Sequence, residues 1–298
     1  MAVATETLQP AKVQAATEDT VRGPIDVVLN SIAYVVLTFV ALLMFVPFAF
    51  SVATSFKSNR EATQPLSLIR MFVPADAVTH AYSTVFDSDI LRWFFNSAFV
   101  AVIWVIGRTF TSATAGYAFA RMEFPGKNIL FLLVLSTLMI PGMVTIVAKF
   151  LILREIGLLD TYGALTLPFL ADAFGIFLMK QFFESIPVEL EEAARIDGAS
   201  RYRMFAQIIL PNAMPAIVAL CIFSFQGSWN AFLEPLFFIS SADLFTLPLG
   251  LAYFRQANYT EWPILMAMAV ITTTPMAIFY IVFQRWFLEG QVSSGIKG

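Results

Sequence analysis

Residues 189–211 read ELEEAARIDGASRYRMFAQIILP, and this stretch, charged at its start, separates two long apolar segments. Its residues follow a defined spacing: Glu192-Ala193-Ala194, three residues, Gly198, nine residues, Ile208, one residue and Leu210-Pro211. Charged side chains are costly inside a bilayer, so the segment is expected to lie in water at one face of a membrane. The pattern therefore predicts a loop that is available to contact another protein.

The composition of the whole chain excludes a soluble globular protein. Its 298 residues are 58% hydrophobic and 13% charged, and the mean hydropathy is +0.76. The formal net charge of −3 provides no basic field, so binding to nucleic acid is not expected. Cys221 and His80 are single residues of their kind, which excludes a disulfide framework and a metal site rich in cysteine or histidine.

Six apolar stretches are long enough to cross a hydrocarbon core of about 30 Å. We predict an all-α membrane protein with spans at Val28–Thr54, Trp93–Phe119, Ile129–Phe150, Tyr162–Phe183, Ile208–Phe232 and Trp262–Phe287. An even number of spans places both termini on the same side. The expected organisation is a disordered cytoplasmic tail over 1–27, a six-span domain over 28–287 with its loop at 186–211, and a cytoplasmic tail over 288–298.

The distribution of Lys and Arg favours a cytoplasmic N-terminus. In that orientation ten of these residues lie inside and seven outside, and Arg108 falls within a span. Cytoplasmic loops of membrane proteins carry the excess of positive charge. The loop at 186–211 contributes Arg195, Arg201 and Arg203 to the inside count, and this orientation places it in the cytoplasm.

Within the loop, Pro187 is suited to the first turn of a short helix, and Gly198 can take the left-handed conformation that ends one. Ser200 can then cap a second helix that leads into span five. On the first helix one face is expected to carry Leu190, Ala193, Ala194 and Asp197, while Glu191 and Arg195 stand four residues apart and can form an ion pair. Because the alanines leave this face shallow, it suits the close approach of another protein better than burial in lipid.

The loop resembles the EAA loop of ATP-binding-cassette (ABC) importer permeases, and every position of that pattern is filled. The resemblance extends over about 92–298 and is closest to the MalG-like inner-membrane subunit of maltose-type carbohydrate importers. It is carried by these further segments: Asn96-Ser97, Ala118-Phe119-Ala120-Arg121, Pro125-Gly126-Lys127, Ile140-Pro141, Gly157-Leu158-Leu159-Asp160, Trp229-Asn230 and the tail from Glu289-Gly290 to Gly295-Ile296-Lys297-Gly298.

The resemblance implies a type I ABC importer permease fold with a cytoplasmic coupling helix, in a bacterial or archaeal cytoplasmic membrane. It also implies a homologous MalF-like second permease, an ABC ATPase dimer and an extracytoplasmic solute-binding protein as partners. The C-terminal tail is expected to reach the ATPase dimer. Contact with the ATPase is expected from Glu191, Glu192, Ala193, Ala194, Asp197, Gly198, Ile208, Leu210 and Pro211.

Motifs for chemistry on this chain are missing from the sequence. It has no Gly-x-x-x-x-Gly-Lys-Ser/Thr stretch for a nucleotide, so ATP and Mg are expected on the partner ATPase subunits and no cofactor on this chain. It also lacks the Gly-x-Ser-x-Gly and His-Glu-x-x-His motifs of hydrolases. We therefore expect a transport subunit and not an enzyme.

Polar residues within spans mark either a solute pathway or contacts between helices. Gln226, Ser228, Trp229 and Asn230 could supply the amide groups and aromatic face that bind a sugar, or hydrogen bonds to the partner permease. Asp172 is a further pathway candidate. Asp172 and Arg108 are expected to pair with each other across spans or with the partner chain.

The predicted function is ATP-driven import of a sugar or oligosaccharide. The alternatives are a permease of the same family for a non-sugar solute or a sugar phosphate such as glycerol phosphate derivatives, and an ion-coupled secondary carrier. The secondary carrier fits less well because Asp172 is nearly alone as an acid within the spans.

Overall fold

The computed structural model describes residues 24–64, 67–257 and 261–295. The chain separates into two compact units, Met1–Phe48 and Ala49–Gly298, which are described one at a time. The predicted tail at 1–27 lies outside the described residues except for its last four, which already belong to helix α1 (Pro24–Ser55). In the first unit the side chains of α1 are exposed from Val28 through Val46 on every side of the helix. A helix that is apolar all round is typical of one surrounded by lipid or by other membrane helices.

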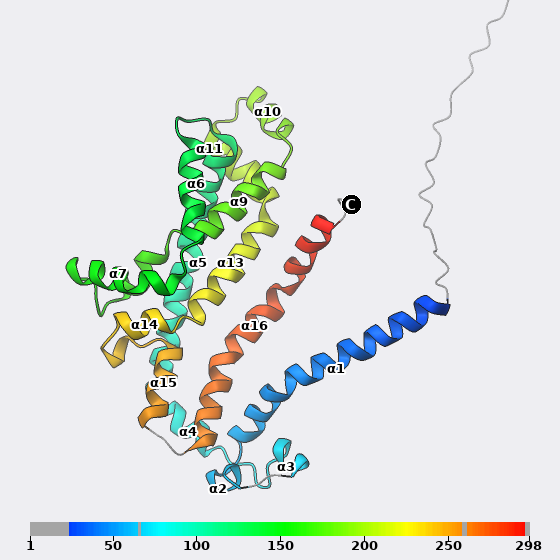
Figure 1. Ribbon diagram of the computed structural model, residues 1–298, viewed down its shortest axis with the longest axis vertical. Coiled ribbons are helices and arrows are strands. Elements are labelled where there is room, and N and C mark those ends of the chain that lie inside the picture. Colours follow the sequence, from blue (N-terminus) through cyan, green and yellow to red (C-terminus); the bar gives the residue numbers. More distant parts are fainter. Residues whose placement is uncertain (1–23, 65–66, 258–260, 296–298) are drawn as a thin grey trace, which may run out of the picture. The chain divides into compact units, whose positions relative to one another are not determined.

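The second unit is helical throughout its described part (Figure 1). Its first helices are α2 (Asn59–Ala62), α3 (Leu68–Phe72), α4 (His80–Phe86), α5 (Ile90–Arg121), α6 (Lys127–Leu138), α7 (Gly142–Glu155), α8 (Tyr162–Thr166), η1 (Leu167–Phe169) and α9 (Ala173–Ser185). The remaining ones are α10 (Glu189–Ile196), α11 (Arg201–Met204), η2 (Phe205–Ile209), α12 (Leu210–Asn212), α13 (Met214–Trp229), α14 (Leu233–Phe238), η3 (Ala242–Leu244), α15 (Leu247–Ala257) and α16 (Trp262–Gly295).

Helix α5 is the centre of the packing, because it contacts α9 along one side and α13 along another, while α13 in turn packs on α16. Small residues allow the close approach of α5 and α9. A Cβ atom on Gly175 would lie 2.3 Å from Ser112 Oγ, and one on Gly116 would lie 2.8 Å from Met179 Cβ. Close helix approach at small residues is typical of membrane proteins, in which van der Waals packing replaces the hydrophobic effect between helices.

Four of the expected spans are single candidate spans in the structure: Val28–Ser55, Ile90–Arg121, Tyr162–Ser185 and Trp262–Gln284. The expected span Ile129–Phe150 is bent, because α6 and α7 form a pair with a bend of 103° between them. Pro141 is the N-cap residue of α7, and a proline within a helix removes a hydrogen bond and clashes with the preceding turn.

The expected span Ile208–Phe232 is also bent, by 77° between the segments Arg201–Asn212 and Met214–Trp229. Pro215 lies in the first turn of α13, where its missing N–H leaves no hydrogen bond broken. The chain therefore contains up to six spans if each bent pair is counted as one. Helix α16 continues through Gly295, so most of the expected tail at 288–298 belongs to this helix.

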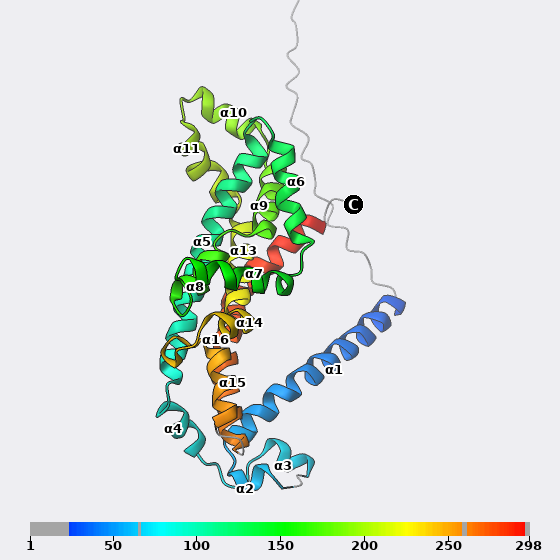
Figure 2. The same ribbon diagram turned by 60° about the vertical axis from the view of Figure 1, so that its left-hand side comes forward.

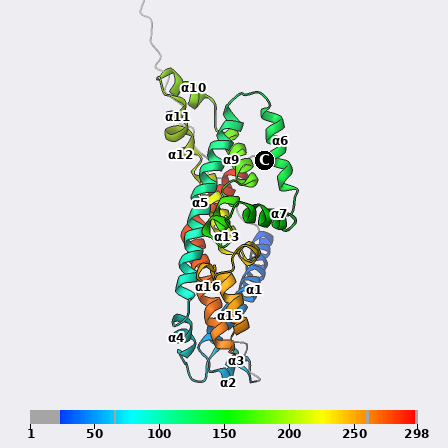
Figure 3. The ribbon, with the colours of Figure 1, turned by 90° about the vertical axis from the view of Figure 1, so that its left-hand side faces the viewer.

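The two ends of the second unit differ in character. In all three views α10 and α11 lie at one end, and α2, α3 and α4 lie at the opposite end (Figures 1, 2 and 3). The loop that carries the conspicuous spacing is therefore separated from the long loop at 55–92 by the full length of α5.

Candidate coupling surface and solute pathway

The helix expected in the loop is α10, and it begins two residues later than predicted. Pro187 precedes the N-cap residue Val188, and Glu189 is the first helical residue. Three carboxylates, those of Glu189, Glu191 and Glu192, occupy its first turn. They complement the positive end of the helix dipole.

Gly198 ends α10 as predicted, with a positive φ of 79°. The N–H of Ala199 donates to the carbonyl of Ala194 at 2.9 Å, and the N–H of Gly198 donates to that of Arg195 at 3.1 Å. These two bonds form the Schellman arrangement, which requires a left-handed residue at this position. Ser200 then caps α11, because its hydroxyl accepts the N–H of Arg203, also as predicted.

Glu191 faces the protein and not the solvent, and this corrects the prediction of an ion pair with Arg195. Its carboxylate lies 2.8 Å from Nε of Arg121, and the other carboxylate oxygen accepts a hydrogen bond from the hydroxyl of Tyr117 at 3.2 Å. The contact with Arg121 is an ion pair by distance, although its geometry does not meet that of a hydrogen bond. Arg121 also donates to the carbonyl of Ile186.

The exposed face of α10 differs from the predicted one. Ala194 is only 8% exposed and lies on the buried side with Glu191, whereas Leu190, Ala193 and Asp197 are exposed. Ile196 is 87% exposed, although the predicted face did not include it. The rotation of the helix is set by Glu191, whose ion pair turns positions 191 and 194 inward.

The surface continues from α10 into the next helix. Tyr202 on α11 is 88% exposed and Val188 is exposed as well. We define the α10 face as Val188, Leu190, Ala193, Ile196, Asp197 and Tyr202. Exposed aliphatic and aromatic side chains beside charged ones are typical of a protein-contact site.

The last residues of the spacing pattern lie away from the α10 face. Ile208 is half-buried in η2, and Leu210 and Pro211 form the first turn of α12.

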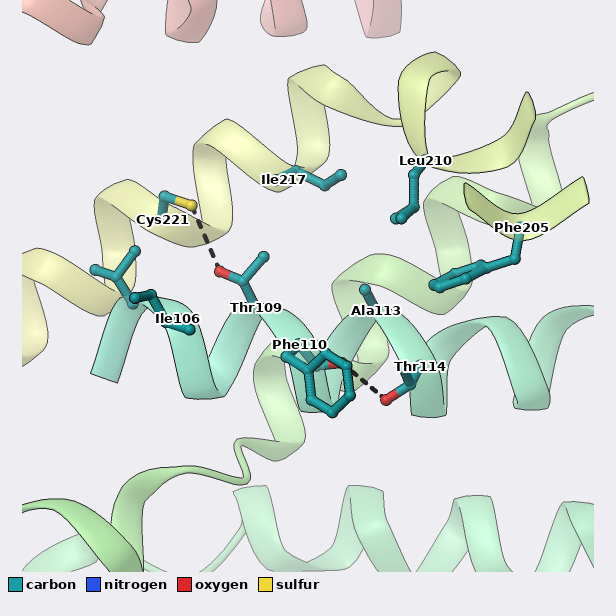
Figure 4. Close-up of a pocket in the computed structure, with 10 residues that line it drawn as sticks. Ile106, Thr109, Phe110, Ala113, Thr114, Phe205, Leu210, Ile217 and Cys221 are labelled. Carbon is teal, nitrogen blue, oxygen red and sulfur yellow. Dashed lines mark hydrogen bonds between the residues drawn. The ribbon is translucent and has the colours of Figure 1, made fainter. Parts of the chain in front are cut away.

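Leu210 lines an apolar groove of about 380 Å³ between α5 and the segment 205–221 (Figure 4). None of the side chains lining this groove is charged, and Thr109 Oγ1 and Cys221 Sγ lie 3.4 Å apart in a single hydrogen bond in which either atom can be the donor. The groove is therefore suited to lipid or an apolar helix and not to a polar solute.

The residues predicted for the solute pathway are divided by the structure. Trp229 is 2% exposed, its indole N–H donates to the carbonyl of Thr272 at 2.9 Å, and its ring stacks on Phe225 at 5.3 Å. The indole N–H thus joins α13 to α16, while the aromatic face is covered by Phe225 of the same helix and is not offered to a sugar. Ser228 is buried, whereas Gln226 and Asn230 are exposed. Helix α13 ends beside α14, between the two ends of the unit (Figure 1).

Asp172 and Arg108 do not form the expected ion pair in the part of the chain that is described. Asp172 is the N-cap of α9, where its carboxylate accepts the N–H of Gly175 at 2.9 Å. Arg108 donates from Nε to the carbonyl of Phe169 at 2.8 Å and lies over the ring of Trp104, 4.2 Å from its centroid. Stacking on an aromatic ring and a hydrogen bond to a carbonyl are both favourable for a guanidinium, and the Asp172 carboxylate is engaged as the N-cap.

Two motif positions that carried the resemblance stabilise the turns near α14 and η3. The amide of Asn96 donates to the carbonyls of Asp243 and Phe245, at 2.8 and 2.9 Å. Asp160, with a φ of 57°, accepts the N–H groups of Ser240 and Ser241, both at 2.9 Å, and the hydroxyl of Ser241. The Ser241 hydroxyl above all, and then the two N–H groups, lower the pKa of the Asp160 carboxyl.

Sequence reasoning missed the partners of Glu191. Arg121 and Tyr117 lie on α5, about seventy residues earlier in the chain, and nothing in the local spacing connects them to α10. The described residues contain no group of three or more His, Cys, Asp or Glu that could hold a metal ion.

Comparison with known proteins identifies the family. Residues 112–290 match the family described as "Binding-protein-dependent transport system inner membrane component". The chain is 34% identical over 262 residues to the arabinooligosaccharides transport system permease protein AraQ of Halalkalibacterium halodurans, with 87% of this chain and 94% of that protein covered. It is also 34% identical over 271 residues to the diacetylchitobiose uptake system permease protein NgcG of Streptomyces coelicolor, covering 89% of this chain and 88% of that one.

A third relative is named for the transport of a phosphate ester and not of an oligosaccharide. The sn-glycerol-3-phosphate transport system permease protein UgpE of Agrobacterium fabrum is 32% identical over 276 residues, covering 88% of this chain and 96% of that one. The fold is similar to a chain in the crystal structure of a bacterial ABC transporter involved in alginate import. That likeness has a TM-score of 0.77 at 24% identity and covers 89% of this chain and 98% of that one. The match over more than half of the chain, together with these relatives, shows that the protein is a member of the family of binding-protein-dependent transport system inner membrane components.

Proposed function

We propose that this permease imports a sugar or oligosaccharide, and that the α10 face is its contact with a separate ATPase. The observation that carries the proposal is the exposed face itself, on a short helix that ends at the left-handed Gly198 and lies at the opposite end of the unit from α2–α4. Two of the relatives described above are named for oligosaccharide or chitobiose uptake, which supports a sugar as the solute.

The proposed assembly contains a homologous second permease, an ATPase dimer that holds ATP and Mg, and an external solute-binding protein. Both termini and α10 are then cytoplasmic, and α2–α4 lie outside. The ATPase contact consists of the α10 face together with Glu192. Gln226 and Asn230 are the remaining pathway candidates, since Trp229 and Asp172 are used to stabilise the fold.

The proposed mechanism depends on rigid attachment of α10 to the ATPase and to the spans. When the ATPase subunits close on ATP they move α10, and the spans joined to α10 open the pathway outward. Changing the ratio of two states from 1:99 to 99:1 requires about 5.5 kcal/mol of differential binding, which nucleotide and the loaded binding protein supply together.

The ATPase contact is tested with Ile196→Asp, which places a charge on the most exposed aliphatic residue of α10. We expect the ATPase to be lost when the complex is purified through this chain, because an unpaired carboxylate would be buried in the interface. Ile69→Asp is the matched control, since Ile69 is 75% exposed on α3 at the opposite end. Ile196→Asp that keeps the ATPase and transports normally would show that α10 is not the contact. Ala194→Asp is unsuitable, because Ala194 faces the protein's own interior.

The solute is tested by ATPase activity of the reconstituted complex with its binding protein, across a panel of sugars and sugar phosphates. Stimulation by one sugar class supports sugar import. The name of the UgpE relative favours a glycerol phosphate as the second candidate, and stimulation by that compound alone would replace the first.

A further inference from the structure

We propose that Arg121, Glu191 and Tyr117 form a clamp that fixes the corner between α9 and α10 onto the cytoplasmic end of α5, so that movement of α10 is transmitted directly to α5. This inference rests on the proposed role of α10 as the ATPase contact. It assigns these three residues as positioning residues for transport. None of them lies on the α10 face.

The contacts of Arg121 explain why the corner is held at two points. Its guanidinium donates to the carbonyl of Ile186, the C-cap residue of α9, and also forms the ion pair with Glu191 in the first turn of α10. The side chains of Arg121 and Glu191 are only 11% and 7% exposed. A single arginine can do this because its donors diverge in a plane, which the ammonium group of lysine cannot reproduce.

Glu191 is also the principal side-chain anchor of α10. Among the described side chains of α10, Glu191 is the one that forms an ion pair and a side-chain hydrogen bond with another helix. The other buried residue of α10, Ala194, contributes only a methyl group. Both charges are favourable in their own helices, since Glu191 lies in the first turn of α10 and Arg121 in the last turn of α5. The pair therefore joins the ends of two helix dipoles at one point.

Helix α5 connects the clamp to the opposite part of the unit. This helix runs over 32 residues to Ile90, and near that end Trp93 and Asn96 bind the carbonyls of Ala242, Asp243 and Phe245. Movement that enters at Arg121 can thus reach the segment 242–245 through one continuous helix. Without the clamp, α10 is joined to the spans only by the chain before and after it and by apolar contact.

The test uses the reconstituted complex and Glu191→Gln, which removes the charge with little change in shape. We expect the ATPase to remain attached, because the α10 face is unchanged, while solute transported per ATP hydrolysed falls by about tenfold, the scale of coupling changes caused by single residues. Glu189→Gln is the matched control, since it makes the same change at an exposed position in the same helical turn. We expect it to behave as the unaltered protein.

Restoring the ion pair between positions 121 and 191 distinguishes a loss of coupling from a loss of folding. The reciprocal exchange Glu191→Arg with Arg121→Glu is expected to recover part of the transported solute per ATP that either single change loses. Recovery is partial because the exchange restores the ion pair but loses the hydrogen bond to the carbonyl of Ile186. Tyr117→Phe removes one hydrogen bond only and is expected to lower the same ratio less than Glu191→Gln does. Normal coupling in Glu191→Gln, or an assembled double variant no better than its single changes, would overturn the inference.

A reversible cross-link provides the second measurement should Glu191→Gln fail to assemble. In a Cys221→Ala background, Arg121→Cys and Glu191→Cys are joined by a short bis-thiosulfonate linker. Transport that requires the linker and is lost on its reduction supports a rigid clamp, whereas transport blocked by the linker shows that α10 must separate from α5. Loss of the ATPase in Ile196→Asp together with normal coupling in Glu191→Gln would leave the ATPase contact in place and remove the clamp alone.

Discussion

At the scale of single residues, Gly198 is the position where backbone conformation decides where α10 ends. Its φ of 79° ends α10 and directs the chain into α11, and a left-handed conformation costs an ordinary residue about 1–2 kcal/mol. We expect Gly198→Val to remain in the membrane but to lose transport and to retain less ATPase on purification. Gly142→Val is the control, because a Cβ there meets nothing within 4 Å and the backbone is not left-handed. Equal transport by both variants would contradict the role of Gly198.

Asp160 gives an acid-sensitive contact outside the spans. Because its pKa is lowered in the folded protein, its stabilising effect is fully present above the unfolded pKa of about 3.9 and is lost as the pH falls through the lower folded value. We expect the amide protection factors of Ser240 and Ser241 to be constant from neutral pH down to about 4 and to fall below it. Asp160→Asn, which tolerates the positive φ, should show weaker protection with no such acid dependence. Unchanged protection in this variant would refute the contact.

At the scale of helices, the crossing of α5 and α9 depends on small residues. A Cβ on Gly175 would lie 2.9 Å from Leu220 Cδ1 as well as 2.3 Å from Ser112, so Gly175→Val has no room without displacing a helix. We expect a loss of roughly 1–3 kcal/mol of stability, seen as a lower unfolding temperature in detergent. Gly227→Ala should change this temperature little, because its nearest atoms are 3.8 Å away. A small effect at Gly175 would mean that the crossing is looser than described.

Helix breaks were less predictable than helix existence. The apolar run at 129–150 is long enough to span, but the sequence does not state whether Pro141 kinks the helix or ends it. The structure places the two halves at 103°, with α14 packed against α7. Neighbouring helices decide such angles, because they must satisfy the carbonyls that a proline leaves free.

At the scale of the whole molecule, orientation is the property to measure. With α10 inside and α2–α4 outside, Ile69→Cys should react with a membrane-impermeant maleimide in intact cells, while Ile196→Cys should react only after the membrane is opened. Both changes are made in a Cys221→Ala background, and that background alone is the control. The reverse pattern of labelling would invert the proposed topology and remove the ATPase contact at α10.

The membrane class, the approximate location of the spans and the capped helix in the loop were determined by the sequence, because hydropathy, capping residues and a glycine stop act over a few neighbouring positions. Tertiary structure alone decided that Glu191 and Ala194 turn inward, that Arg121 is the partner of Glu191 and that Trp229 joins two helices. The physical reason is that the rotation of a helix and the partner of a buried charge depend on residues far away in the chain. Glu191 and Arg195 are neighbours on α10, but the buried Arg121 offers a contact shielded from water, and electrostatic attraction is stronger there than on an exposed helix surface.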